Sequence, residues 1–341
     1  MNWLIYFLEA FVVGIIIGSL VLLFKKKYKN EIVRRWGGVI VIGTSLLIIL
    51  VNPELEITGQ IFSILVGGLA ILVFGVLDDF KKISWKYQLV FQFALAAFFV
   101  LFGFNIGHIK LFDDVALNFN VLELNVLGNH FYLLATGAFI LWAIIVVNSI
   151  NWIDGIDGLS GTIFVMALLS IIFVSLRPEV NQPAIVIMSL IMIGATLAFL
   201  VFNFSFSSLI AGTSGSYFFG FILATLAVIA GMKIATLMLI VILPLIDAVW
   251  VVFDRIRNKQ SVFVGDHRSR HLHYRLISIG WSEKKIVFVF GIFLACILGV
   301  NFCLQSRDFK LAFLILEFLT IILFMIYVHK KELSTKLSKN D

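Results

Sequence analysis

The segment Asn148-Ser-Ile-Asn151-Trp-Ile-Asp154-Gly-Ile-Asp157-Gly158 joins two uninterrupted apolar stretches of the chain. Its two carboxamides and two carboxylates recur at every third position, so on a helix or a tightened turn they form one polar stripe. A charge beside a membrane-spanning helix is costly unless it is paired or hydrated. The segment therefore predicts a hydrated metal or phosphate site at a membrane surface, and a purely structural role for the stripe is the less favoured alternative.

The composition is that of an integral membrane protein. Of the 341 residues, 61% are hydrophobic and 13% are charged, and the mean hydropathy is +1.07. A membrane-spanning helix needs about 20 mostly apolar residues. Eleven segments are predicted to be such spans: 2–24, 37–52, 59–77, 87–105, 131–150, 159–176, 184–202, 214–231, 234–253, 286–305 and 310–328. The expected fold is an all-α polytopic membrane protein, with residues 1–341 forming a single integral membrane domain, and a small β-hairpin is expected in the loop 106–130.

The basic residues predict the orientation. With the N-terminus outside and the C-terminus in the cytoplasm, 21 of the 26 lysines and arginines lie on the cytoplasmic side. Such an excess of basic residues marks the cytoplasmic side of plasma-membrane proteins. The formal net charge of +6 is explained by topology and by attraction to anionic lipid or phosphate, so nucleic acid is not an expected partner.

The unusual polar residues fall on that same cytoplasmic side. They lie in the loops 25–36, 78–86, 151–158, 203–213 and 254–285, which we expect to form the active face. The candidate site residues are Asp78, Asp79, Lys82, Asn148, Asn151, Asp154, Asp157, Asn203, Gly212, Thr213, Arg255, His271, His273 and Arg275. Several have ordinary alternatives: Asp78 and Asp79 could form a solvated helix end with weak ion pairs, and Gly212 could belong to a simple turn.

Aspartates, basic residues and glycines together suit phosphoryl transfer assisted by a divalent cation. Oxygen ligands favour Mg²⁺ or Mn²⁺ over zinc. His271 and His273 are two residues apart and lack an obvious third ligand, so zinc is disfavoured there. The neighbouring Arg268, Arg270 and Tyr274 argue instead for contact with an anion.

These motifs resemble the polyprenyl-phosphate N-acetylhexosamine-1-phosphate transferase family, known as glycosyl transferase family 4. Gly75-Val-Leu-Asp78-Asp79-Phe-Lys-Lys82 resembles its paired-aspartate motif, and Asn148 to Leu159 resembles its most distinctive signature. Pro244-Leu-Ile-Asp247 followed by Arg255 matches another element. The run His271-Leu-His273-Tyr-Arg275 resembles the motif of the branch that transfers N-acetylglucosamine 1-phosphate to undecaprenyl phosphate.

The resemblance implies transfer of a sugar 1-phosphate from a UDP-sugar to a polyprenyl phosphate, with release of UMP, at the start of a cell-surface glycopolymer. It implies that Asp78 and Asp79 orient or deprotonate the lipid phosphate, and that Asp157 and Asp154 hold Mg²⁺ and the diphosphate. His271, His273 and Arg275 would contact the diphosphate or the sugar. The implied partners are the lipid phosphate, the UDP-sugar and membrane lipids, with a homodimer as the assembly considered.

Two departures from the family pattern bear on activity. Thr213 stands where the family has a metal-binding aspartate, and Arg34 stands where a proline is usual. Loss of that carboxylate predicts weaker metal affinity and a lower rate, by about 10²–10³-fold for one preorganised electrostatic group. The second hypothesis is therefore a catalytically impaired relative that binds lipid phosphate or nucleotide sugar. A secondary transporter is the third hypothesis, and the chain lacks the internal repeat that it would predict.

Overall fold

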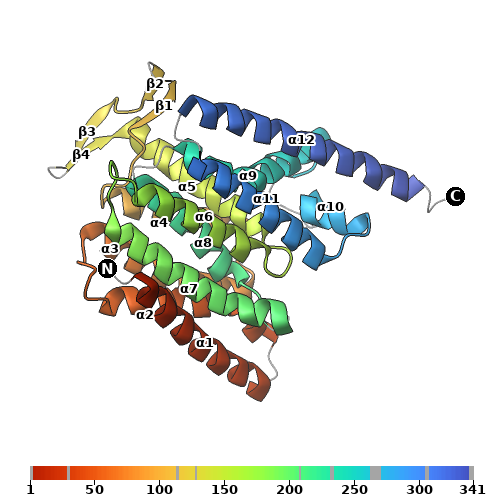
Figure 1. Ribbon diagram of the computed structural model, residues 1–341, viewed down its shortest axis with the longest axis horizontal. Coiled ribbons are helices and arrows are strands. Elements are labelled where there is room, and N and C mark those ends of the chain that lie inside the picture. The colour runs from red at the N-terminus through yellow and green to blue at the C-terminus, as the bar shows by residue number, and fades with distance from the viewer. Residues whose placement is uncertain are drawn as a thin grey trace.

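The computed structural model describes residues 3–28, 31–112, 115–126, 129–206, 209–230, 234–261, 270–303 and 307–337, and it is mostly helical (Figure 1). Its α-helices are α1 (Trp3–Tyr28), α2 (Gly37–Val51), α3 (Gly59–Lys81), α4 (Trp85–Val100), α5 (Leu133–Ile153), α6 (Leu159–Ser175), α7 (Pro183–Phe206), α8 (Gly212–Ile229), α9 (Ile234–Arg257), α10 (Leu272–Ser278), α11 (Glu283–Cys303) and α12 (Arg307–Leu337). A short 3₁₀ helix, η1 (Glu31–Arg35), connects α1 to α2.

Each predicted span coincides with one long helix, and the short α10 is the additional helix of the described chain. Seven of the described helices are long and apolar enough to cross a membrane, namely α1, α3, α5, α7, α8, α11 and α12. Helices α2, α4 and α6 are also apolar but are shorter. The chain is thus a polytopic membrane protein, and a total of eleven crossings stays a prediction.

The loop predicted to hold one hairpin contains two antiparallel strand pairs. Strand β1 (His108–Phe112) pairs with β2 (Val115–Asn118), and β3 (Glu123–Val126) pairs with β4 (Asn129–Tyr132). The Asn118 side chain accepts a hydrogen bond from the backbone N–H of Asn120 at 2.9 Å. This local turn separates the two sheets instead of closing one hairpin, because asparagine readily bonds its own backbone two residues on. Both sheets extend beyond the helices at one end of the bundle (Figure 1).

Helix α8 is the central element of the bundle. It packs against α2, α3, α5 and α6, and every residue from Ser214 to Ala227 is buried. A helix that is apolar on all sides is compatible with such an enclosed position. Its first residues, Gly212 and Thr213, are therefore held at a fixed point among the surrounding helices.

Gly212 is required where η1 and α3 meet the start of α8. Its φ angle is +69°, which favours glycine, and a Cβ atom there would lie 2.2 Å from the backbone oxygen of Arg35 and 2.6 Å from Asp79 Oδ2. No larger residue fits without moving backbone. This close approach brings the end of α3 and the beginning of α8 into direct contact.

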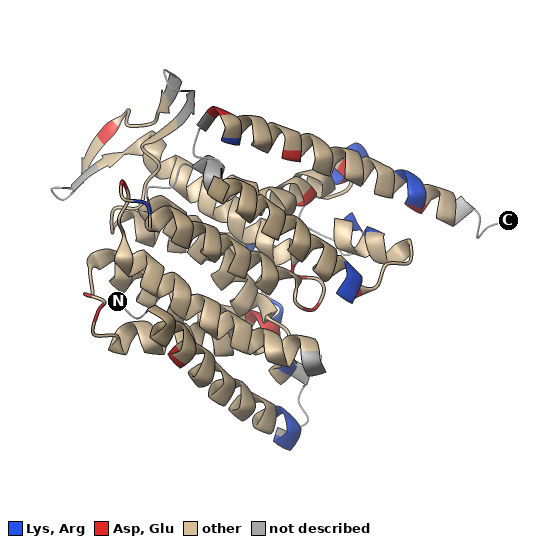
Figure 2. Cartoon of the chain, in the orientation of Figure 1, with Lys and Arg blue, Asp and Glu red and all other residues tan. Residues whose placement is uncertain are grey.

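The charged residues are distributed unevenly over the bundle. The basic ends of α1 and α12 and the basic residues near α10 and at the start of α11 lie on the side away from the two β-sheets (Figure 2). The C-terminal end of α3 and the N-terminal end of α8 belong to the same side. The polar clusters singled out in the sequence thus occupy the basic end of the bundle.

Candidate active site

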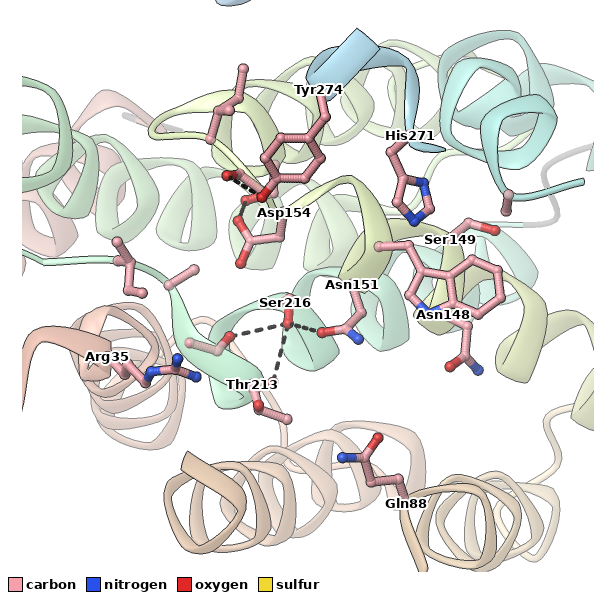
Figure 3. Close-up of a pocket in the computed structure, with 18 of the residues that line it drawn as sticks. Arg35, Gln88, Asn148, Ser149, Asn151, Asp154, Thr213, Ser216, His271 and Tyr274 are labelled. Carbon is pink, nitrogen blue, oxygen red and sulfur yellow. Dashed lines mark hydrogen bonds between the residues drawn. The ribbon is translucent and has the colours of Figure 1, made fainter. Parts of the chain in front are cut away.

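A cavity of about 1050 Å³ lies at this end of the bundle (Figure 3). Its wall is formed by η1, α4, the end of α5 and the following turn, α7, the start of α8, α9, and the residues around α10. Eight of the candidate residues line it: Asn148, Asn151, Asp154, Asp157, Asn203, Gly212, Thr213 and His271. Residues far apart in the sequence therefore share one enclosed space.

The cavity also has an apolar wall. Leu89 and Ile145 from α4 and α5 lie on it, and Leu245 and Val249 contribute from α9. Leu89, Ile145 and Val249 are exposed. Such an apolar wall would suit the apolar part of a ligand, and the polar wall its charged part.

The first pair of carboxylates is on the last turn of α3, inside the helix and not in the predicted loop. Asp78 accepts hydrogen bonds at Oδ1 from the backbone N–H of Ile83 at 2.8 Å and from Gln88 Nε2 at 3.1 Å. Its Oδ2 accepts a hydrogen bond from the Thr213 hydroxyl at 2.7 Å. Three donors on one buried carboxylate hold it in a single orientation.

Asp79 is paired with a cation. Arg35 Nη1 lies 3.2 Å from its Oδ1, and the backbone N–H of Thr213 donates to its Oδ2 at 3.2 Å. The Thr213 hydroxyl lies 3.3 Å from Oδ1 as well. Thr213 therefore connects both carboxylates of the pair to the first turn of α8.

The second pair of carboxylates follows α5. Asp154 caps the helix and accepts a hydrogen bond from the Ser160 hydroxyl, whereas Asp157 accepts one from Asn203 Nδ2 at 3.1 Å. Burial raises the pKa of Asp154 to about 7, the carboxylates of Asp157 and Asp79 add to this, and the Ser160 hydrogen bond opposes it. Negative charge thus accumulates around Asp154, which favours a bound cation or proton.

The two asparagines of the stripe are on the last turns of α5. Asn148 Nδ2 donates to Gln92 Oε1 at 2.7 Å, and Asn151 Oδ1 accepts a hydrogen bond from the Ser216 hydroxyl at 2.8 Å. Figure 3 shows Asn151 directed toward Ser216 and Thr213 across the cavity. The helix ends at Ile153, so the predicted stripe is helical in its first half and continues as a turn in its second half.

His271 lines the cavity, and a buried carboxylate positions it. His271 Nδ1 lies 2.7 Å from Asp247 Oδ2, and the backbone N–H of Leu272 donates to Asp247 Oδ1 at 2.8 Å. A charged carboxylate can only accept hydrogen bonds, so Nδ1 carries the hydrogen and Nε2 is left for a ligand.

His273 lies behind the cavity wall. It is fully buried, neither ring nitrogen has a hydrogen-bond partner in the described structure, and a Cβ atom on Gly155 would lie 2.2 Å from its Nε2. Burial lowers the pKa of His273 to about 4, His271 adds to this, and Asp247 opposes it. Beside it, the Tyr274 hydroxyl donates to the backbone oxygen of Gly155 at 3.0 Å. His273 and Tyr274 thus support the turn that carries Asp154 and Asp157.

Three other candidates have side chains directed elsewhere. Arg275 donates to the backbone oxygen of Arg270 at 2.8 Å and contacts His329 Nδ1 at 2.9 Å, and it does not line the cavity. Arg255 donates to the backbone oxygen of Ser261. Lys82 ends α3 in a left-handed conformation and is exposed. Arg268, expected to contact an anion, lies outside the described residues.

Sequence reasoning missed the two glutamines of α4. Gln88 connects Asp78 to the Tyr217 hydroxyl, which donates to Gln88 Oε1 at 3.1 Å, and Gln92 pairs with Asn148. Both glutamines line the cavity. The sequence contains a pattern that could have predicted them. Two carboxamides one helical turn apart in an apolar span lie on one face of the helix and need buried hydrogen-bond partners.

The oxygen donors around Asp157 fit a magnesium ion. Asn203 Nδ2 donates to Asp157 and to the backbone oxygen of Leu209, so its own Oδ1 is left buried without a partner in the described structure. Mg²⁺ uses one or two carboxylates and keeps positions for water and substrate phosphate. Within the described ranges, no cluster of three or more His, Cys, Asp or Glu side chains could hold a metal alone. The donor set therefore suits a cation shared with a phosphorylated ligand.

Comparisons with a family model and with individual known proteins point to the same family. Residues 61–231 match the model of glycosyl transferase family 4. The chain is 29% identical to a probable undecaprenyl-phosphate N-acetylglucosaminyl 1-phosphate transferase of Bacillus subtilis, over 89% of this chain and 80% of the relative. It is 27% identical to a phospho-N-acetylmuramoyl-pentapeptide-transferase of Thermotoga maritima, over 67% and 72% of the two chains. The matched region contains both carboxylate pairs and Thr213, and the chain belongs to glycosyl transferase family 4.

Proposed function

We propose that this protein transfers N-acetylglucosamine 1-phosphate from a UDP-sugar to a polyprenyl phosphate and releases UMP. The observation that carries the proposal is a cavity lined by Asp154, Asp157 and Thr213, in which Thr213 bonds directly to Asp78 and Asp79 beside the cavity wall. The polar lining suits a nucleotide sugar, and the apolar wall suits the chain of a lipid phosphate. Family membership supports the same class of reaction, transfer of a sugar 1-phosphate to a lipid carrier.

The proposed step exchanges one phosphorus–oxygen bond for another. An oxygen of the lipid phosphate forms a bond to the β-phosphorus of the UDP-sugar, and the bond from that phosphorus to the bridging oxygen breaks. UMP leaves with the electron pair, and the lipid then carries a diphosphate-linked sugar. Such a transfer depends on positioning and on stabilising the charge of the phosphoryl oxygens.

The residues divide the proposed work between two sides of the cavity. Asp78 and Asp79 orient the lipid phosphate, and Asp157 with Asp154 holds Mg²⁺, which would neutralise diphosphate charge when bound. Asn148, Asn151, Asn203, Gly212 and His271 face the ligand from the cavity wall. Arg255 and Arg275 instead bind backbone oxygens of the protein, so we assign them to holding the chain near the cavity and not to binding the ligand.

The proposed location is the plasma membrane, with the cavity facing the cytoplasm. The support is the excess of basic residues at the cavity end of the bundle (Figure 2). Labelling a cysteine introduced at Lys26 or at Leu122 in intact cells tests this orientation. Both positions are exposed. Lys26 is near the end of α1, just before η1, and Leu122 lies between β2 and β3. We expect an impermeant reagent to label the second position and to spare the first.

The reaction itself is tested with the purified full-length protein in lipid nanodiscs. With Mg²⁺, UDP-N-acetylglucosamine and undecaprenyl phosphate, we expect release of UMP and formation of a lipid-linked sugar, and both products require both substrates. Binding of either substrate without any UMP release would reject the transferase proposal and favour the impaired relative.

One contact specifically favours the second candidate, a relative that binds its ligands without turnover. Thr213 donates its hydroxyl to Asp78 at 2.7 Å and thereby occupies a carboxylate oxygen that the transferase would use. Thr213→Asp removes this donor and adds a carboxylate, whereas Thr213→Val removes the donor without adding charge. A rise in UMP release in the aspartate variant only, together with half-maximal activity at a lower Mg²⁺ concentration, identifies the wild-type protein as impaired.

A further inference from the structure

Arg34 occupies a defined place in the cavity wall. The backbone N–H of Ile210 donates to the Arg34 oxygen at 2.7 Å, and the N–H of Gly37 donates back to the Ile210 oxygen at 2.9 Å. Gly37 also permits this contact sterically, because a Cβ atom there would lie 2.5 Å from the same Ile210 oxygen. The chain around Arg34 is thus fixed beside the loop that leads into α8, on the side of the cavity that contains Asn203.

The two neighbouring arginines of η1 differ in their partners. Arg35 is paired with Asp79. Arg34 has no hydrogen-bond or ion-pair partner for its guanidinium in the described structure, and its Nε is buried. An unsatisfied buried donor is unfavourable, so proteins seldom retain one unless a ligand or water completes it.

The charge of the cavity makes this difference informative. Arg34 and Arg35 are the two permanently cationic side chains among the described residues that line it. Because Asp79 already balances Arg35, Arg34 is the cation that remains for a ligand. A guanidinium binds phosphoryl oxygens through two parallel hydrogen bonds, which a lysine cannot reproduce.

We propose that Arg34 binds a phosphoryl oxygen of the nucleotide sugar and sets the affinity of the cavity for the donor diphosphate. This inference rests on the proposed function. The same chemistry is offered by the lipid phosphate, but the position of Arg34 favours the soluble donor. The backbone of Arg34 binds Ile210, which follows the residue whose carbonyl Asn203 binds beside Asp157, whereas the apolar wall is built from α4, α5 and α9.

The test is equilibrium binding to the full-length protein in nanodiscs, measured by calorimetry, for wild type, Arg34→Gln and Arg34→Lys. Lys26→Gln is the matched control, since it removes one positive charge from an exposed residue of the preceding helix. The probes are UDP-N-acetylglucosamine, inorganic pyrophosphate and uridine, each with and without Mg²⁺. Undecaprenyl phosphate is measured separately.

We expect Arg34→Gln to weaken binding of UDP-N-acetylglucosamine and of pyrophosphate by roughly 10- to 100-fold, with Arg34→Lys intermediate, as for the loss of a charge-assisted hydrogen bond. Uridine binding and the Lys26→Gln control stay at wild-type values. The loss is also expected without Mg²⁺, because the arginine contacts the phosphate directly.

Other outcomes reject the inference. Equal loss of uridine affinity would indicate a structural effect of the substitution, and a loss confined to undecaprenyl phosphate would assign Arg34 to the lipid. Unchanged affinity for all ligands in Arg34→Gln would remove its role while leaving the proposed function intact. Failure of the wild-type protein to bind UDP-N-acetylglucosamine would reject the proposed function itself, and pyrophosphate binding then shows separately whether Arg34 holds a phosphate.

Discussion

The carboxylate pair that lines the cavity and the pair beside its wall are held in different ways. Asp78 and Asp79 accept hydrogen bonds from the backbone of Ile83, from Gln88, Thr213 and Arg35. Asp154 and Asp157 follow the end of a helix, and in the described structure each accepts a hydrogen bond from one side chain, Ser160 and Asn203 respectively. The first pair therefore has more hydrogen-bond donors around it than the second pair has in the described structure.

This difference indicates a division of labour. A carboxylate that accepts several hydrogen bonds is held in one orientation, which suits the positioning of a substrate. A carboxylate with few donors keeps oxygen lone pairs free for a cation, and a cation beside Asp154 would also oppose the effect of burial, which raises its pKa. The first pair therefore serves as a positioned framework, and the second pair is the place where a cation with its diphosphate is expected.

The largest expected effect is from Asp157→Asn. The change keeps the size of the side chain but removes its charge, so we expect UMP release to fall by roughly 10²–10³-fold. We also expect Asp157→Asn to abolish the thermal stabilisation by UDP-N-acetylglucosamine with Mg²⁺, whereas Asp78→Asn retains it. Asp308→Asn, at an exposed position on α12, is the control. Retention of the ligand-induced shift in Asp157→Asn would contradict the division between the two pairs.

A smaller effect is expected from the residues that orient Asp78. Tyr217→Phe removes the hydroxyl that donates to Gln88 Oε1. Gln88→Leu removes the amide that donates to Asp78. Each is expected to lower kcat by roughly 3- to 10-fold, in line with one neutral hydrogen bond. If the two act through one chain, the double variant is no slower than Gln88→Leu alone. Tyr87→Phe, at a tyrosine 69% exposed on the same helix as Gln88, should leave kcat unchanged.

The pH dependence of the rate in Ser160→Ala tests whether the charged form of Asp154 is needed for activity. The hydroxyl lowers the pKa of Asp154 by stabilising its charged form, so its removal raises that pKa above about 7. If the charged form is the active one, the acid limb of the rate profile moves to higher pH. The rate is then several-fold lower near pH 6.5 and unchanged at high pH. Thr162→Val removes a hydroxyl that donates to the Gly158 backbone, and it should not move the limb.

The smallest effect concerns stability and not turnover. Burial holds the pKa of His273 at about 4, below its ordinary value of 6.5, so the unfolded chain binds the proton more readily. The stability from the neutral buried ring is complete above pH 6.5 and is lost as the pH falls toward 4. By pH 5 the loss is up to about 2 kcal/mol at 1.36 kcal/mol per unit. Unfolding midpoints of His273→Phe should fall less between pH 7 and 5 than those of wild type, and the exposed His108→Phe should behave as wild type.

Much of this arrangement could be predicted from the sequence. Apolar length predicted a helix at each of the eleven spans, and the three-residue spacing of Asn148, Asn151, Asp154 and Asp157 placed all four on one cavity. Both patterns depend on local geometry, which a sequence expresses directly. The proposed chemical roles of these residues remain predictions.

The rest depends on tertiary contacts that no local pattern contains. His271, His273 and Arg275 are close in sequence, yet one lines the cavity, one lies behind Gly155 and one contacts His329. Their directions are set by the short helix α10 and its neighbours. The pairing of Thr213 with Asp78 likewise joins residues 135 positions apart, and only the packing of α8 against α3 brings them together.

The enclosed position of α8 has a consequence for biosynthesis. Thr213 and Gly212 are made after helices α1 to α7, yet they complete the surroundings of Asp78 and Asp79, which are made early. A nascent chain that ends before α8 therefore exposes a carboxylate pair at the membrane without its later partners. Quality-control proteases that sense such unpaired charge would have a simple criterion for removing incompletely inserted chains.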